Sequence, residues 1–255
     1  MSTTPPADSL VELAARKQLP HHQYTDHATV RWIESNRPEF SDDSPPRLRP
    51  TSQRLLYRSA IPPNWLAEAK VTDSLHGIRH GMRTAALAAL LAEATGLGED
   101  ETATLILAAA VHDCRRLHDK DDHGHGSRAA LWLTEHANTV WDHFHLAPTP
   151  SRIDQAATAV RLHDLPYAAF TAEDQADHAG AEQISDLLKA ADALDRYRLP
   201  KLKWWPDSAL IRAAAFDQLR ATAFDLVVWS EAAHLAGLDS TDAVFKALEQ
   251  RELIS

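Results

Sequence analysis

A histidine and an aspartate stand side by side directly after one of the most apolar runs of the chain, in the segment AAAVHDCRR. Burying such polar groups is costly unless each is paired, hydrogen-bonded or bound to a metal ion. His112 and Asp113 therefore raise the question of what satisfies them. Mixed imidazole and carboxylate ligands suit Mn, Fe, Zn or Ni, so a metal is one answer.

Two other predicted helices carry side chains of the same types. His76, His80 and Arg83 are spaced i, i+4 and i+7, which places all three on one face of a helix. Asp192 lies in LLKAADALDRY beside an apolar stripe, where a carboxylate needs a partner and a metal ion is one. Two imidazole nitrogens and two carboxylates from three helices are then available, from His80, His112, Asp113 and Asp192.

The elements that must position these residues are predicted to be helices. Glycine, which helices tolerate poorly, occurs only 8 times in 255 residues, and no segment shows the sustained alternation of a strand. The apolar segment EDETATLILAAAV, with acids at its start, is expected to form a central buried helix. Further helices are predicted from Asp73 or Ser74 to Gly96 or Gly98, Ser127 to about Phe144, Ser151 to His163, His178 to Tyr197, Ser208 to Leu235 and Thr241 to Leu253.

The first 60 residues differ in composition from the rest. Proline-containing stretches such as STTPPADS and FSDDSPPRLRP predict irregular backbone. Short helices are expected between them, at Ser9 to Gln18 and near Gln53 to Tyr57. We therefore expect an N-terminal extension over residues 1–60, packed on a helical domain over residues 61–255.

Composition limits the partners and the compartment. The net charge is −10, which disfavours binding to nucleic-acid duplexes and anionic membranes. Cys114 is the only cysteine, so no intrachain disulfide forms, and the N-terminus lacks a signal-peptide pattern. The apolar run from Ala85 to Ala92 is too short to cross a bilayer. These features predict a cytoplasmic protein and leave its oligomeric state open.

Three segments, in order, resemble the motifs of the HD superfamily of metal-dependent phosphohydrolases. They are HGMRTAALAALLA, AAAVHDCRR and LLKAADALDRYR, and the resemblance covers roughly residues 72–200. It implies an all-α HD-domain bundle, with C-terminal helices added over residues 208–253. It also implies a metal ion held by His80, His112, Asp113 and Asp192.

Dinuclear members of the superfamily add two histidines between the doublet and the last aspartate. HGHGSRAALWL resembles the first of these motifs, with His125 fitting better than His123, and AATAVRLHDLPY resembles the second, giving His163. The implied cofactor is one or two divalent ions (Mn, Fe, Ni or Zn), with Asp113 as the bridging carboxylate. The Gly-Lys that signalling members often carry after the doublet is absent, as is the signature of the cyclic-dinucleotide branch.

The resemblance implies hydrolysis of a phosphoester or phosphoanhydride of a small molecule, for which a nucleotide is a candidate. Asp113 is expected to orient the attacking water, and Arg116, helped by His76 or Arg83, to neutralise charge on the phosphate. Arg83, Arg116 and Arg128 are the candidate substrate-binding residues, although arginines beside acids often only form ion pairs. Two alternatives remain open: a mixed-valent diiron oxygenase, and a catalytically silent nucleotide-sensing module.

Overall fold

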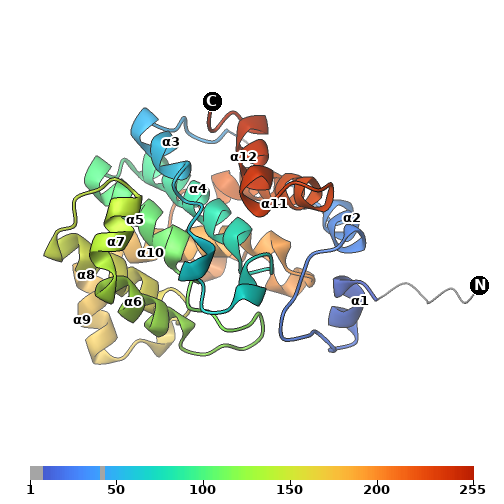
Figure 1. The fold of residues 1–255 in the computed structure, drawn as a ribbon, viewed down its shortest axis with the longest axis horizontal. Coiled ribbons are helices and arrows are strands. Elements are labelled where there is room, and N and C mark those ends of the chain that lie inside the picture. The colour runs from blue at the N-terminus through green and yellow to red at the C-terminus, as the bar shows by residue number, and fades with distance from the viewer. Residues whose placement is uncertain (1–7, 41–43) are drawn as a thin grey trace, which may run out of the picture.

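The computed structural model describes residues 8–40 and 44–255, and every regular element within them is a helix (Figure 1). The predicted all-α class is thus confirmed for this part of the chain. The α-helices are α1 (Leu10–Ala15), α2 (His27–Ser35), α3 (Pro50–Leu56), α4 (Ile78–Thr95), α5 (Glu99–Val111), α6 (His125–Glu135), α7 (Ala137–His143), α8 (Pro150–Leu162), α9 (Ala172–Gly180), α10 (Glu182–Leu194), α11 (Arg220–Leu235) and α12 (Ser240–Gln250). Short 3₁₀ turns are η1 (Pro63–Trp65), η2 (Ala69–Val71), η3 (Tyr167–Ala169), η4 (Asp195–Arg198), η5 (Leu202–Trp204), η6 (Ser208–Leu210) and η7 (Asp217–Leu219).

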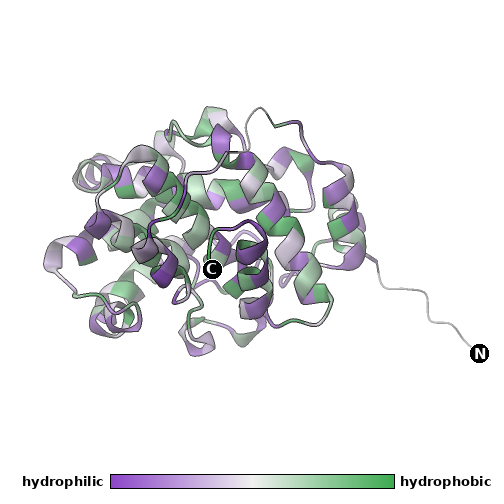
Figure 2. Ribbon diagram, turned by 90° about the horizontal axis from the view of Figure 1, so that it is seen from above, coloured by the Kyte–Doolittle hydropathy of each residue, from purple (hydrophilic) through white to green (hydrophobic). Residues whose placement is uncertain are grey.

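Helices α4 and α5 form the centre of the fold. Residues 78–92 of α4 and 102–111 of α5 are all buried. Burial was expected for α5, which is apolar on every side, whereas α4 also buries polar side chains. Helix α10 packs against both helices and α8 against α5, and α3 and α12 cover other parts of the pair. Figure 2 shows hydrophilic residues on the outward faces of the peripheral helices. None of the helices in the described ranges is long and apolar enough to cross a membrane.

The contact between α4 and α5 depends on a glycine. A Cβ atom added at Gly81 would lie 2.9 Å from the carbonyl oxygen of Ala110, which is rigid helix backbone. Gly81 therefore lets the two backbones approach closely. Gly81 directly follows His80, and Ala110 lies two residues before His112. The close approach brings these two histidines within reach of each other.

Buried ion pairs join α11 to α4. Glu231 accepts from Arg79 Nε and Nη2 at 3.1 and 2.9 Å, and from Arg83 Nη1 at 2.7 Å. All three side chains are about 2% exposed or less. Burial raises the pKa of Glu231, but the two guanidinium groups outweigh it and lower that pKa to about 2.

The N-terminal segment contributes to the core. Val30, Ile33, Leu48, Leu55 and Leu56 are buried within the same hydrophobic cluster as α4 and α5. Helix α1, predicted over Ser9 to Gln18, covers Leu10–Ala15 with Ser9 as its N-cap, and α3 overlaps the second predicted helix. Helix α2 was not predicted. Residues 1–7 and 41–43, which fall in the two stretches predicted to be irregular, lie outside the described residues.

Several predicted helix bounds are wrong. Helix α4 begins at Ile78, after Gly77, because the chain turns so tightly there that a Cβ at Gly77 would lie 2.2 Å from the carbonyl oxygens of residues 71 and 72. The predicted helix from Ser127 to Phe144 is broken at His136, and that from His178 to Tyr197 at Ala181. Neither break has a proline, and both residues leave the helical conformation, with φ of −112° and −136°.

The last two predicted helices also differ at their ends. Residues 208–219 form short 3₁₀ turns and irregular backbone, so α11 begins only at Arg220. Helix α12 ends at Gln250, followed by Glu252 with a φ of 56°. A residue at positive φ cannot continue a right-handed helix, which accounts for the early end.

Replacing Gly81 by alanine is expected to destabilise the protein. The new methyl group must push α4 away from α5, at a cost of about 1–3 kcal/mol in the free energy of unfolding. Gly180→Ala is the control, because a Cβ at Gly180 meets nothing within 4 Å. Denaturant unfolding of both variants measures the difference, and equal stability of the two would contradict the argument.

The Glu231 pairs predict a pH-dependent stability. Because the folded-state pKa is about 2 against a usual value of 4.5, the contribution is complete above about pH 4.5 and is lost as the pH falls towards about 2. It is on the order of 3 kcal/mol. The free-energy gap between wild type and Glu231→Gln should therefore shrink on acidification, while exposed Glu249→Gln follows wild type. A gap independent of pH would disprove the assignment.

Candidate metal centre

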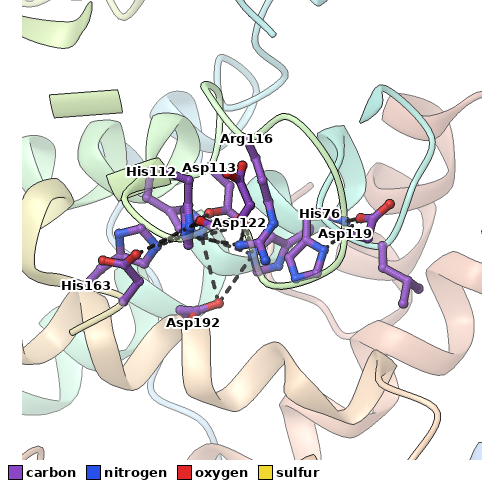
Figure 3. Close-up of polar contacts among 12 residues, drawn as sticks. His76, His112, Asp113, Arg116, Asp119, Asp122, His163 and Asp192 are labelled. Atoms are coloured by element: carbon purple, nitrogen blue, oxygen red, sulfur yellow. Dashed lines mark hydrogen bonds and ion pairs between the residues drawn. The ribbon is translucent and has the colours of Figure 1, made fainter. Parts of the chain in front are cut away.

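Six side chains meet where the ends of several helices converge (Figure 3). His80 lies within α4, and Asp192 within α10. The other four lie at helix ends: His112 and Asp113 directly follow α5, His125 is the first residue of α6, and His163 directly follows α8. The structure thus brings together all six predicted ligands, His80, His112, Asp113, His125, His163 and Asp192.

The first cluster contains two imidazoles and two carboxylates. His80 Nε2 and His112 Nε2 lie 3.0 Å apart. Asp192 Oδ1 lies 3.3 Å from His80 Nε2 and 3.8 Å from His112 Nε2. Asp113 Oδ2 lies 3.5 Å from His80 Nε2. The ligand atoms of His80, His112 and Asp192 lie close enough together to hold a single ion, and Asp113 lies beside them.

The second cluster shares Asp113. His125 Nε2 and His163 Nε2 lie 3.2 Å apart, and Asp113 Oδ1 lies 3.0 and 3.4 Å from them. This oxygen is buried and accepts no hydrogen bond, which leaves it free for a cation. Gly126 allows α6 to come this close, because a Cβ there would lie 2.8 Å from the carbonyl oxygen of Val160.

The hydrogen bonds of the four imidazoles determine which nitrogen is free. Nδ1 of His112, His125 and His163 lies 2.7 Å from the carbonyl oxygens of Ala109, Asp122 and Val160. Nδ1 of His80 lies 2.8 Å from Asp195 Oδ2. Because these oxygens only accept, each Nδ1 must carry a hydrogen, and each neutral ring then has its lone pair on Nε2. Four lone pairs and two carboxylates converge, so the donor set fits a bound cation.

The pKa values of the imidazoles show that the site stabilises positive charge. Burial and Arg198 lower the pKa of His80, but the carboxylates around it raise it to about 9, whereas burial lowers that of His112 to about 3. The pKa of His125 is raised as well: burial lowers it, but the charge of Asp113 outweighs this effect. In the first cluster His80 therefore carries a second proton at pH 7, and binding of a metal ion there would release it and free the lone pair on Nε2.

The pKa values of the two carboxylates are well below their usual range. Burial raises both, but Arg116 and the histidines outweigh it at Asp113, and His80 does so at Asp192. Both are therefore ionised and available as ligands.

Arg83 is not at the site that was predicted for it. It is fully buried, with Nε 2.6 Å from Asp195 Oδ1 and Nη1 2.7 Å from Glu231 Oε1. Its guanidinium is thus occupied by two carboxylates and does not line the cavity at the metal ligands. Because Arg83 lies three residues after His80, it is on the same side of α4 but further along the helix, towards α11. Its position does not support substrate binding.

Arg128 and Arg116 also differ in their positions. Arg128 Nη2 pairs with both carboxylate oxygens of Asp122, at 2.7 and 2.6 Å, and Arg128, a predicted substrate-binding residue, does not line the cavity. Arg116 does line it, with Nη1 3.1 Å from His125 Nε2 and 3.6 Å from Asp113 Oδ2. Its other nitrogens donate to backbone carbonyls, which fixes the guanidinium there.

His76 lines the cavity beside Arg116. Its Nδ1 lies 2.8 Å from Asp119 Oδ1. The Ser74 hydroxyl and the backbone N–H of Gln23 also donate to the Asp119 carboxylate. Burial and the charge of Arg116 lower the pKa of His76 to about 3. His76 is therefore neutral at pH 7.

The ligands open onto a cavity of about 240 Å³. Arg196 and Arg198 also line it, and Arg198 Nη2 lies 3.4 Å from His80 Nε2. Sequence reasoning missed both arginines, as well as Asp195, which orients His80. Their signal was the segment DALDRYR, in which they follow Asp192 within two helical turns. A larger cavity of about 620 Å³ lies between α3 and α5, but it contains none of the predicted site residues.

No family model matches the chain, and comparisons with curated proteins and with solved structures give no match either. What the structure establishes is therefore an all-helical protein with buried His/Asp clusters that can hold metal ions.

Metal content tests the two clusters separately. Protein purified without added metal or chelator should contain about two equivalents, since Asp113 serves both clusters. His112→Ala/Asp113→Ala should lose both, and His125→Ala about one. His123→Ala, an exposed histidine two residues away, is the control and should keep both. Mass spectrometry of the metals measures this. No metal in wild type, even after reconstitution with Mn or Fe, would contradict a metal site.

Proposed function

We propose that this chain is a metal-dependent phosphohydrolase of the HD type, which cleaves a phosphoester or phosphoanhydride of a small molecule. The observation that carries the proposal is the shared carboxylate: Asp113 presents one oxygen to each of two imidazole pairs. If Asp113 and the two imidazole pairs hold two divalent ions, these ions would supply a water of lowered pKa and positive charge for the phosphate oxygens. Imidazole-rich ligation of this kind suits Mn, Fe, Ni or Zn.

The cavity supplies positive charge for a phosphate group. Arg116, Arg196 and Arg198 line it together with the metal ligands. Guanidinium groups match phosphate oxygens in two-point hydrogen bonds, and in a site with little water they stabilise the charge that develops on those oxygens. Arg116 is the nearest to Asp113, so we assign to it the main contact with the reacting phosphate.

We assign to His76 a role other than the expected neutralisation of charge on the phosphate. Because it is neutral, it cannot add positive charge to the site. With its Nδ1 hydrogen directed at Asp119, its Nε2 is an acceptor. We assign to His76 the orientation of a water or a substrate hydroxyl that donates to Nε2.

A panel of small phosphate esters and anhydrides, including nucleotides, tests the activity. Wild type loaded with Mn, Ni or Zn should release phosphate, and Arg116→Gln should lower kcat about 10²–10³-fold because a charge contact made in the transition state is lost. Arg116→Lys should fall between the two. Arg152→Gln, which removes a surface ion pair with Asp100, is the control and should retain full activity.

The same panel separates the proposal from its alternatives. Iron in the purified protein, with O₂ consumption and a diiron EPR signal but no phosphate release, would replace hydrolysis by oxygenase chemistry. Nucleotide binding without turnover in the metal-loaded protein would identify a sensing module instead.

A further inference from the structure

A second cavity adjoins the metal centre. It has a volume of about 500 Å³ and is lined in part by His163, Asp164, Asp192 and Arg196, which also line the 240 Å³ cavity. We call it the outer cavity. Because the two share these four residues, a molecule with a phosphate at the metal ligands can extend into the outer cavity.

The walls of the outer cavity are held in place by buried hydrogen bonds. The hydroxyl of Tyr167 donates to Asp186 Oδ1 at 2.6 Å, which fixes the ring. The Lys189 ammonium donates to the carbonyls of Leu162 and His163, at 2.8 and 2.9 Å, and to that of Leu165. All three hydrogens of Lys189 are therefore used on the loop after α8, and this lysine is not free for a ligand.

Two arginines that line the outer cavity differ from Lys189 in the partners of their charged groups. Within residues 8–40 and 44–255, neither Arg196 nor Arg212 has a carboxylate partner, whereas Arg79, Arg83 and Arg161 are all paired. The Arg212 guanidinium lies over the Tyr167 ring, 3.8 Å from its centroid. Stacking orients a guanidinium while leaving its N–H groups available at the edge.

The acidic groups of the outer cavity are already engaged with the metal ligands. Asp192 faces the imidazoles of the first cluster, and Asp164 Oδ2 lies 3.4 Å from His125 Nδ1. The free charge in the outer cavity therefore comes from the two guanidinium groups. Two positive charges on a wall that also has apolar residues, Leu210 and Ile211 among them, match a dianionic phosphate on a short organic group.

We propose that the outer cavity binds a second phosphate of the substrate, so that the enzyme acts on bisphosphorylated small molecules. One phosphate lies at the metal ligands beside Arg116 and Arg198. Arg196, which lines both cavities, binds the other phosphate together with Arg212. This inference rests on the proposed phosphohydrolase function, since it takes the metal centre as the place of the first phosphate.

Non-hydrolysable probes test the inference apart from turnover. Alkane bisphosphonates with chains of three to six carbons, each paired with the alkyl monophosphonate of the same length, are titrated into the metal-loaded protein by calorimetry. At least one bisphosphonate should bind ~10- to 100-fold more tightly than its monophosphonate, as expected for charged hydrogen bonds to a second phosphate. In Arg212→Gln this advantage should disappear while the affinity for the monophosphonate stays the same.

Two further variants complete the test. Arg196→Gln should also remove the advantage. Arg31→Gln should retain it, because Arg31 likewise has no carboxylate partner in the described part of the chain but lies on α2, outside the cavity. Equal affinity within every pair, an advantage that survives Arg212→Gln, or no binding of any probe would overturn the inference. Phosphate release from the ester panel decides the proposed function independently, because the phosphonates report binding alone.

Discussion

The structure depends on holding four imidazole lone pairs and two carboxylates together out of water, an arrangement that only a cation makes favourable. Three of the four imidazoles are oriented by the backbone alone. His112, His125 and His163 each direct Nδ1 to the carbonyl oxygen three residues earlier in the chain. Such carbonyls are free only where a helix ends or has not yet begun. The position of the site at the ends of α5 and α8 and at the start of α6 is therefore a requirement of its ligands.

His80 is the exception, and it accounts for much of the remaining architecture. Its neighbours in α4 use their carbonyls within the helix, so its Nδ1 needs a side-chain acceptor, which is Asp195. A fully buried carboxylate needs a counter-charge, and Arg83 supplies it. Arg83 in turn contacts Glu231 on α11, and Glu231 contacts Arg79. A chain of alternating charges thus connects the ligands to the C-terminal helices, which belong to the site in this physical sense.

Three imidazoles are oriented by backbone carbonyls and one by a distant side chain. This difference determines what could be predicted from the sequence. Helix formation and the choice of His80, His112, Asp113 and Asp192 as candidate ligands follow from local patterns, namely apolar periodicity and polar residues beside apolar stripes. His125 and His163 follow only from the resemblance to known motifs. The position of Arg83 follows from neither, because its spacing from His80 defines a face of α4 but not which helix covers that face. Arg196 and Arg198 stand in the motif LLKAADALDRYR itself, but their spacing does not show that the turn η4 after α10 brings them to the cavity. The breaks at His136 and Ala181 have no proline to mark them.

The charge of the chain and the charge of the cavity differ. The chain carries a net charge of −10, which disfavours extended polyanions such as nucleic acids at long range. The cavity lining is balanced instead, because Arg116, Arg196 and Arg198 stand beside Asp113, Asp164 and Asp192. Bound divalent cations are often the largest charges in a site, so ions held by the histidines and by Asp113 and Asp192 would make this balance positive. The proposed binding of a phosphate therefore depends on the metal ions as much as on the arginines.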